Sequence, residues 1–105
     1  MATVQVYVPR RAFALIELSD VRAIADEWGL ARVRFERSDY KTPHNMTRLT
    51  SGIAEATLII ACFMHIARSA SYKRDTALLL ECAAAVKTIF DGIATARFYD
   101  EAMRH

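Results

Sequence analysis

The chain has 105 residues, of which 53% are hydrophobic and 25% are charged, so an intrinsically disordered protein is excluded and a single domain over residues 1–105 is expected. Its net charge of +2 is too small to indicate a nucleic acid or an anionic membrane as the partner. With three Gly and two Pro, the chain also has too few turn residues for an all-β architecture.

A short strand is predicted at the start of the chain. Val4, Val6 and Val8 alternate with polar residues, which is typical of a strand with one buried face, and Pro9 is expected to end it. Residues 10–18 fit either a short helix or the second strand of a β-hairpin, and we favour the helix.

The next segment predicts a helix followed by a second strand. Ser19 and Asp20 can accept hydrogen bonds from the free amides of a first helical turn, and Gly29 is a natural helix terminator. After it, Val33 and Phe35 alternate with charged residues, which indicates a strand with one solvated face.

Residues 38–50 gather turn formers without periodicity and predict a long polar loop. The first fifty residues hold eight Lys or Arg against six Asp or Glu, and most of this basic excess lies between Arg32 and Arg48. Aromatic and cationic side chains together are enriched at protein interfaces. We therefore expect segment 32–48 to bind a protein partner, with these contact residues: Arg32, Arg34, Tyr40, Lys41, His44, Asn45 and Arg48.

The second half of the chain predicts two long helices that form an antiparallel hairpin. Residues 52–68 are apolar on nearly every side of a helix. Residues 75–103 carry a heptad series with 4-3 spacing from Leu78 to Met103, although Gly92 could end one helix and begin another. The expected fold class is α+β, with a small N-terminal β-α-β-like part packed on the helical pair. An all-α bundle is the alternative, in which the valine strand is an extended arm.

A helix that is apolar on all sides must be covered on all sides, and a small chain has little material to cover it. We therefore predict a homodimer in which a second copy shelters the region around Leu58–Met64. The expected interface residues are Ile59, Phe63, Ile66, Leu78, Cys82, Ile89 and Ala96. The longest uncharged apolar run, Ala56–Met64, is shorter than the ~20 residues that a membrane span needs, so no membrane partner is expected.

Few residues suggest chemistry. Cys62 and His65 lie three residues apart on a predicted helix, and Cys82 could add a third ligand, but no second ligand pair exists, so neither a metal nor another cofactor is expected. His44 is accompanied by no nucleophile motif or phosphate-binding loop, which predicts that the chain is not an enzyme. Both cysteines lie in apolar runs, as buried free thiols do in the reducing cytoplasm.

The sequence thus favours a small non-catalytic interaction module, such as an adaptor or an inhibitor, that acts as a homo-oligomer. The alternative is a DNA-binding regulator, because residues 19–40 resemble the first helix and turn of a helix-turn-helix unit, with Ala25 at the helix contact and Gly29 at the turn. Residues 32–37 alternate, however, and do not predict a recognition helix. An enzyme that uses His44 is the least favoured hypothesis.

Overall fold

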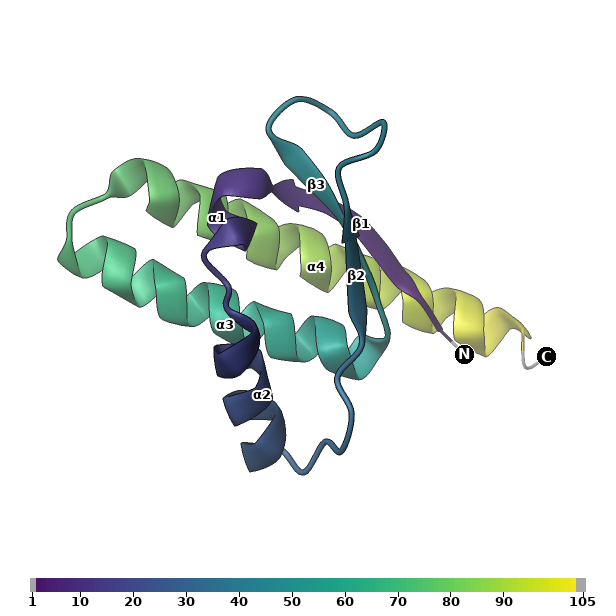
Figure 1. The fold of residues 1–105 in the computed structure, drawn as a ribbon. Helices are drawn as coiled ribbons and strands as arrows, with labels where there is room; N and C mark the ends of the chain where they lie inside the picture. The colour runs from purple at the N-terminus through teal and green to yellow at the C-terminus, as the bar shows by residue number, and fades with distance from the viewer. Residues whose placement is uncertain (1, 104–105) are drawn as a thin grey trace.

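The computed structural model describes residues 2–103, which form three strands and four helices. The helices α3 and α4 form an antiparallel hairpin, and the sheet packs against it (Figure 1). The predicted α+β class is therefore confirmed, and the all-α alternative is wrong. In chain order the elements are β1 (Val4–Pro9), α1 (Arg10–Ala14), α2 (Leu18–Glu27), β2 (Phe35–Ser38), β3 (Met46–Ser51), α3 (Ile53–Tyr72) and α4 (Thr76–Met103).

The sheet is antiparallel, with the strand order β1-β3-β2. In β1, Val4, Val6 and Val8 are buried while Gln5 and Tyr7 are exposed, as their alternation predicts. The central strand β3 separates β1 from β2, so β2 forms one edge of the sheet (Figure 1).

Strand β3 lies in a segment that the sequence predicts to be loop, and that prediction is wrong for residues 46–50 and for Ser38, the last residue of β2. The inward positions of β3 are Thr47, Leu49 and Ser51, all of them buried. Two of these three residues are polar, so the hydrophobic alternation that marks a half-buried strand is absent. The turn formers are confined to residues 39–45, where Lys41 and Asn45 have left-handed backbone angles (φ 54° and 63°) and close a hairpin between β2 and β3.

The two short helices follow the sequence prediction with one difference. Residues 10–14 form α1, as favoured for segment 10–18. Helix α2 begins at Leu18, one residue before Ser19, and no side chain caps its first turn, so the predicted cap is wrong. At its other end Gly29 has φ 72°, and the Leu30 amide donates to the Ala25 carbonyl at 2.9 Å, as expected of a terminating glycine.

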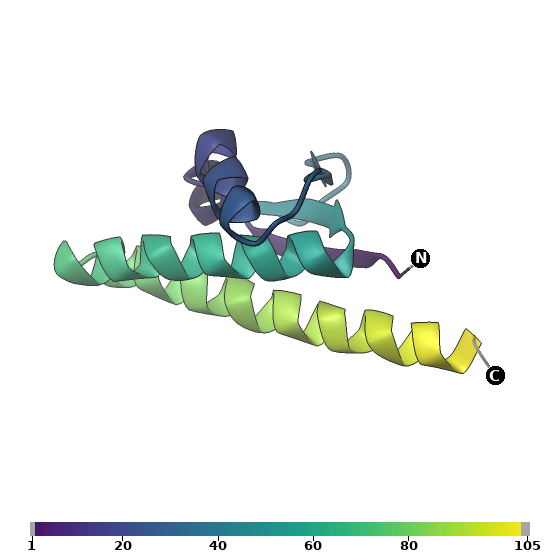
Figure 2. The ribbon, with the colours of Figure 1, turned by 90° about the horizontal axis from the view of Figure 1, so that it is seen from below.

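Helix α3 is covered largely by its own chain. On one side Leu58 and Cys62 form a buried cluster with Val21 and Ala25 of α2. On the other side α4 packs along α3, and Phe63 meets the Phe13 ring of α1 at a centroid distance of 6.0 Å. Figure 2 shows α4 on one side of α3 and the short helices α1 and α2 on the other, while the sheet packs on α4 through β1. Met64 remains 51% exposed, so the covering is not complete.

The predicted dimer-interface residues therefore lie in the core of one chain. Ile59, Phe63, Leu78, Cys82, Ile89 and Ala96 are buried, and Ile66 is half-buried. The sequence reasoning placed an N-terminal part on the helical pair but did not anticipate the third strand, nor how fully this part would cover these side chains. In this structure these side chains offer little surface to a second copy, and a dimer would have to use another face.

Helix α4 continues through Gly92 without a break. A Cβ atom at this position would lie 2.6 Å from Cγ1 of Val6 and 3.1 Å from Cγ1 of Val4. Gly92 therefore lets α4 approach β1 more closely than any larger residue could. The helix cost of a mid-helix glycine is offset by this contact.

By length and composition alone, α3 is the one helix in residues 2–103 that could cross a membrane, with a mean hydropathy of 1.4. The core helix of a soluble protein has the same properties. Here α3 packs against α2 and α4 within the chain.

Candidate protein-interaction site

The seven predicted partner-binding residues lie at three places on and around the β2–β3 hairpin. Arg32 and Arg34 are exposed in the segment that leads into β2. The tip of the hairpin holds Tyr40, Lys41, His44 and Asn45, all exposed. Arg48 is half-buried in β3. The structure therefore places all seven on one β-hairpin and its approach, but it does not gather them into a single cluster.

The outer edge of β2 is the most extended feature of this site. Strand β2 pairs with β3 on one side, and within the described part of the chain no strand pairs with its other side. An edge strand presents backbone amides and carbonyls that can extend the sheet. Glu36 and Arg37, in the middle of β2, are exposed.

Two shallow grooves flank the approach to β2. One, of about 640 Å³, is lined by Leu18, Val33, Arg34, Phe35, Glu36 and Thr50 among others. The other, of about 370 Å³, is lined by residues of α2 and of segment 30–34 that include Arg22, Arg32 and Arg34. Arg34 and Val33 border both grooves, so cationic and apolar side chains lie close together here, with Glu36 in the first groove and Asp26 in the second.

The hairpin tip is fastened to α1 by Arg10. The Arg10 amide donates to the Asn45 carbonyl at 2.8 Å, and its guanidinium donates to the Met46 carbonyl at 3.0 Å. The same guanidinium also lies 3.4 Å from the Asp39 carboxylate. The Lys41 ammonium is 5.4 Å from the centre of the Tyr40 ring. Because the Asp39 carboxylate is already paired with Arg10, it offsets little of the positive charge of Lys41 at the tip.

Arg48 lies on the open face of the sheet. Its register partners are Tyr7 in β1 and Ser38 in β2, and Thr50, two residues further along β3, is opposite Gln5 and Glu36. These side chains point away from the helical layer because their neighbours in each strand are the inward ones. Arg48 is therefore one residue of a polar sheet face and lies off the β2 edge.

Arg37 belongs to the site, although it is not among the seven predicted residues. Its guanidinium carbon lies 5.8 Å from the centre of the Phe13 ring, so the cation rests on the aromatic face while the residue stays exposed. The sequence did hold a signal for Arg37, because the two-residue period of a strand places position 37 on the same face as Phe35, and the residue falls within the basic segment.

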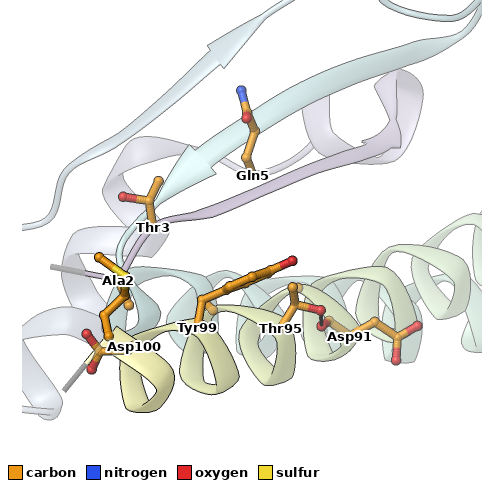
Figure 3. Close-up of a pocket in the computed structure, with 10 residues that line it drawn as sticks. Ala2, Thr3, Gln5, Asp91, Thr95, Tyr99 and Asp100 are labelled. Atoms are coloured by element: carbon orange, nitrogen blue, oxygen red, sulfur yellow. Dashed lines mark hydrogen bonds between the residues drawn. The ribbon is translucent and has the colours of Figure 1, made fainter. Parts of the chain in front are cut away.

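A further groove, of about 630 Å³, lies between the start of β1 and the second half of α4. Figure 3 shows Thr3, Thr95, Tyr99 and Asp91 around it. Its lining residues include hydroxyls and the carboxylates of Asp91 and Asp100, but no His, Cys or Lys.

The cavity that holds Cys62 and His65 is smaller, at about 210 Å³, and is mostly apolar, with Asp20 on its wall. Burial, together with the charge of Asp20, raises the pKa of the Cys62 thiol to about 11, so at neutral pH this group stays protonated and is a poor nucleophile or metal ligand. Burial also raises the pKa of Cys82. Among the described residues, no group of three or more His, Cys, Asp or Glu could hold a metal ion.

The segment that resembles a helix-turn-helix unit lacks its second helix. Helix α2 is followed by Gly29, by residues 30–34 outside any helix or strand, and then by β2. A recognition helix is the element that enters the major groove in this motif. Arg32 and Arg34 are therefore both carried by the irregular segment that leads into β2.

Comparison with protein families, with curated proteins and with solved structures gives no match for this chain.

Proposed function

We propose that the protein is a small, non-catalytic interaction module, an adaptor or an inhibitor, that binds an extended acidic segment of a protein partner along the edge of β2. The observation that carries this proposal is an unpaired strand edge with cations at both of its ends. Arg32 and Arg34 precede β2, Arg37 lies within it, and Lys41 follows it.

The backbone supplies affinity in this mode of binding. A segment that adds to a sheet edge satisfies the outward amides and carbonyls of β2 and pairs its own at the same time. Strand β2 is short, with four residues, so side-chain contacts beyond its ends are needed for a stable complex.

The charges define the partner's chemistry. Within residues 32–41 the four cations Arg32, Arg34, Arg37 and Lys41 stand against Glu36 and Asp39. Asp39 lies 3.4 Å from Arg10, which offsets its charge. A partner with carboxylates at alternate positions would meet Arg32 and Arg34 favourably, while a basic segment would be repelled.

The grooves beside β2 supply places for apolar side chains. Val33, Phe35 and Leu18 line the larger groove together with Arg34. An extended segment that alternates acidic and apolar residues would direct carboxylates toward the arginines and apolar side chains into this groove. Because both cysteines are free thiols, we place this activity in the reducing cytoplasm.

The test is binding of a fluorescent peptide of alternating Glu and Val, measured by anisotropy, with a peptide of alternating Gln and Val as the neutral control. Charge reversal in the double variant Arg32→Glu/Arg34→Glu should weaken binding by roughly tenfold, since each exposed cation contributes up to about 1 kcal/mol. The matched control is Lys73→Glu/Arg74→Glu, which makes the same charge change at the exposed turn between α3 and α4. It should leave the affinity within about twofold of the wild type.

Equal losses in the two double variants would show that only net charge matters and would contradict the proposal. The DNA-binding alternative predicts a different result. In that case the protein would retard random duplex DNA in a salt-sensitive manner, and the peptide would bind weakly or not at all.

A further inference from the structure

The outer face of α4, turned away from α3, carries a second heptad series. Positions with 4-3-4-3-4 spacing share one side of a helix. The two large apolar members at its ends, Leu80 and Phe98, are 64% and 68% exposed. Every member of the series is exposed, and we call it the outer seam: Leu80, Ala84, Lys87, Asp91, Ala94 and Phe98.

The outer seam lies opposite the face that α4 buries. The buried series includes Leu78, Cys82, Ala85 and Ile89. The two series are offset by two residues, which corresponds to a rotation of about 200° around the helix. In Figure 2, α4 lies at the edge of the molecule with α3 and the sheet on its other side. No element in residues 2–103 therefore packs on the outer seam.

The order of residues along the outer seam is symmetric about its middle. A large apolar residue occupies each end, an alanine follows at each side, and two opposite charges lie at the centre. If two α4 helices run antiparallel with a two-fold axis level with Ile89, Leu80 faces Phe98 of the second copy and Ala84 faces Ala94. Lys87 then faces Asp91 of the second copy, and this contact occurs twice.

Charge selects the antiparallel arrangement. Within one chain the Lys87 ammonium lies 3.0 Å from the Asp91 carboxylate, and both side chains are largely exposed. An antiparallel pair adds two more opposite-charge contacts and makes a ring of four alternating charges. A parallel pair in register would set Lys87 against Lys87 and Asp91 against Asp91, which is repulsive.

The side chains around the charges also suit this arrangement. Ala84 and Ala94 let the two helices approach closely. Phe90, which is 56% exposed, lies beside the seam near its middle, so the two-fold axis places the Phe90 rings of both copies side by side.

We propose that the protein forms a homodimer through the outer seam of α4, as an antiparallel helix pair. This inference is independent of the binding proposed for β2. If a fully exposed large side chain offers roughly 200 Å² of surface, the exposed parts of Leu80, Phe90 and Phe98 in two copies supply roughly 700 Å² of buried area. The alanines and the aliphatic stem of Lys87 bring the total buried area to about 1,000 Å². That is the lower end of specific interfaces, so the dimer is reversible and depends on concentration.

The first test is sedimentation velocity over a concentration series. The wild type should shift from monomer to dimer as its concentration rises toward about 100 µM. Lys87→Glu and Asp91→Lys should each weaken dimerisation by at least about tenfold, because each sets like charges against one another. The double variant Lys87→Glu/Asp91→Lys restores every opposite-charge contact and should dimerise within about threefold of the wild type.

Folding and association are separated by the same variants. Because the outer seam is exposed in the monomer, each variant should keep the helical content of the wild type by circular dichroism at low concentration. A wild type that stays monomeric throughout the series would overturn the proposal. So would a dimer that neither single charge reversal weakens.

The second test is cross-linking, which reports the orientation of the helices. Ala84→Cys and Ala94→Cys chains, when mixed and oxidised, should form a disulfide-linked dimer between the two variants. Each variant alone should give little cross-linking, because in the antiparallel pair its own two cysteines are separated by about 15 Å along the helix axis. A parallel pair would instead link each variant to itself, and that result would refute the arrangement.

Discussion

Cys62 belongs to α3 and is buried against α2, and this environment makes the ionisation of its thiol costly. Burial, with the charge of Asp20, raises the pKa of its thiol from 9.0 to about 11. The sequence analysis predicted a buried free thiol from its apolar neighbours, and the structure confirms that prediction. What the sequence did not indicate is the contact with α2, because Val21, Ala25 and Cys62 meet only after the chain folds back.

This pKa shift predicts a change of stability with pH. Below pH 9 the Cys62 thiol is protonated in both the folded and the unfolded chain, so its burial costs no free energy of ionisation and the folded state keeps its full stability. Between pH 9 and about 11 the unfolded chain ionises first, so the free energy of unfolding should fall by about 2–3 kcal/mol. Urea unfolding across this range should show the decrease, and Cys62→Ala should flatten it. An identical slope in that variant would mean that other groups cause the loss.

At the scale of elements, the sequence predicted strongly periodic segments well and weakly periodic ones badly. The valine alternation of β1 and the heptad series of α4 repeat over enough residues to define a buried face, and the apolar run of α3 is long enough to predict a covered helix. Strand β3 has no such repeat, because its inward side carries the polar residues Thr47 and Ser51 around Leu49. Its pairing with both β1 and β2 is what makes it a strand, and this information is not local.

The same limit applied to the candidate site. The basic segment 32–48 was recognised from composition, but its edge strand could be identified only once β3 was placed between β1 and β2. The heptad series of α4 was also found in the sequence. It was assigned to a dimer interface, although a hairpin with α3 was predicted, because the sequence did not show that β1 would also cover it.

The contact between α4 and β1 provides a prediction at this scale. Gly92→Ala should raise helix propensity yet lower stability by about 1–3 kcal/mol, because the new methyl group would clash with Val6 Cγ1, 2.6 Å away. Thermal or urea unfolding measures the change. Val6→Ala removes the obstructing atom, so the double variant Val6→Ala/Gly92→Ala should lose less than the sum of the single losses. Strict additivity would show that α4 and β1 do not meet closely here.

At the scale of the whole molecule, one chain covers most of its apolar central helix and leaves exposed the two surfaces for which binding is proposed. One is the edge of β2 with its row of cations, and the other is the outer seam of α4. Strand β2 contacts β3, whereas α4 packs against α3 and β1, so the two surfaces belong to different elements. A dimer through α4 would therefore leave β2 free, and each copy could bind a partner segment.

Backbone hydrogen exchange in β2 tests the central claim most directly. The outward amides of residues 35–38 have no strand partner in the described chain and should exchange quickly in the free protein. With the peptide of alternating Glu and Val bound, exchange in residues 35–38 should slow, while exchange in the α3–α4 turn should not change. Unchanged exchange in β2 at saturating peptide would contradict binding along this edge.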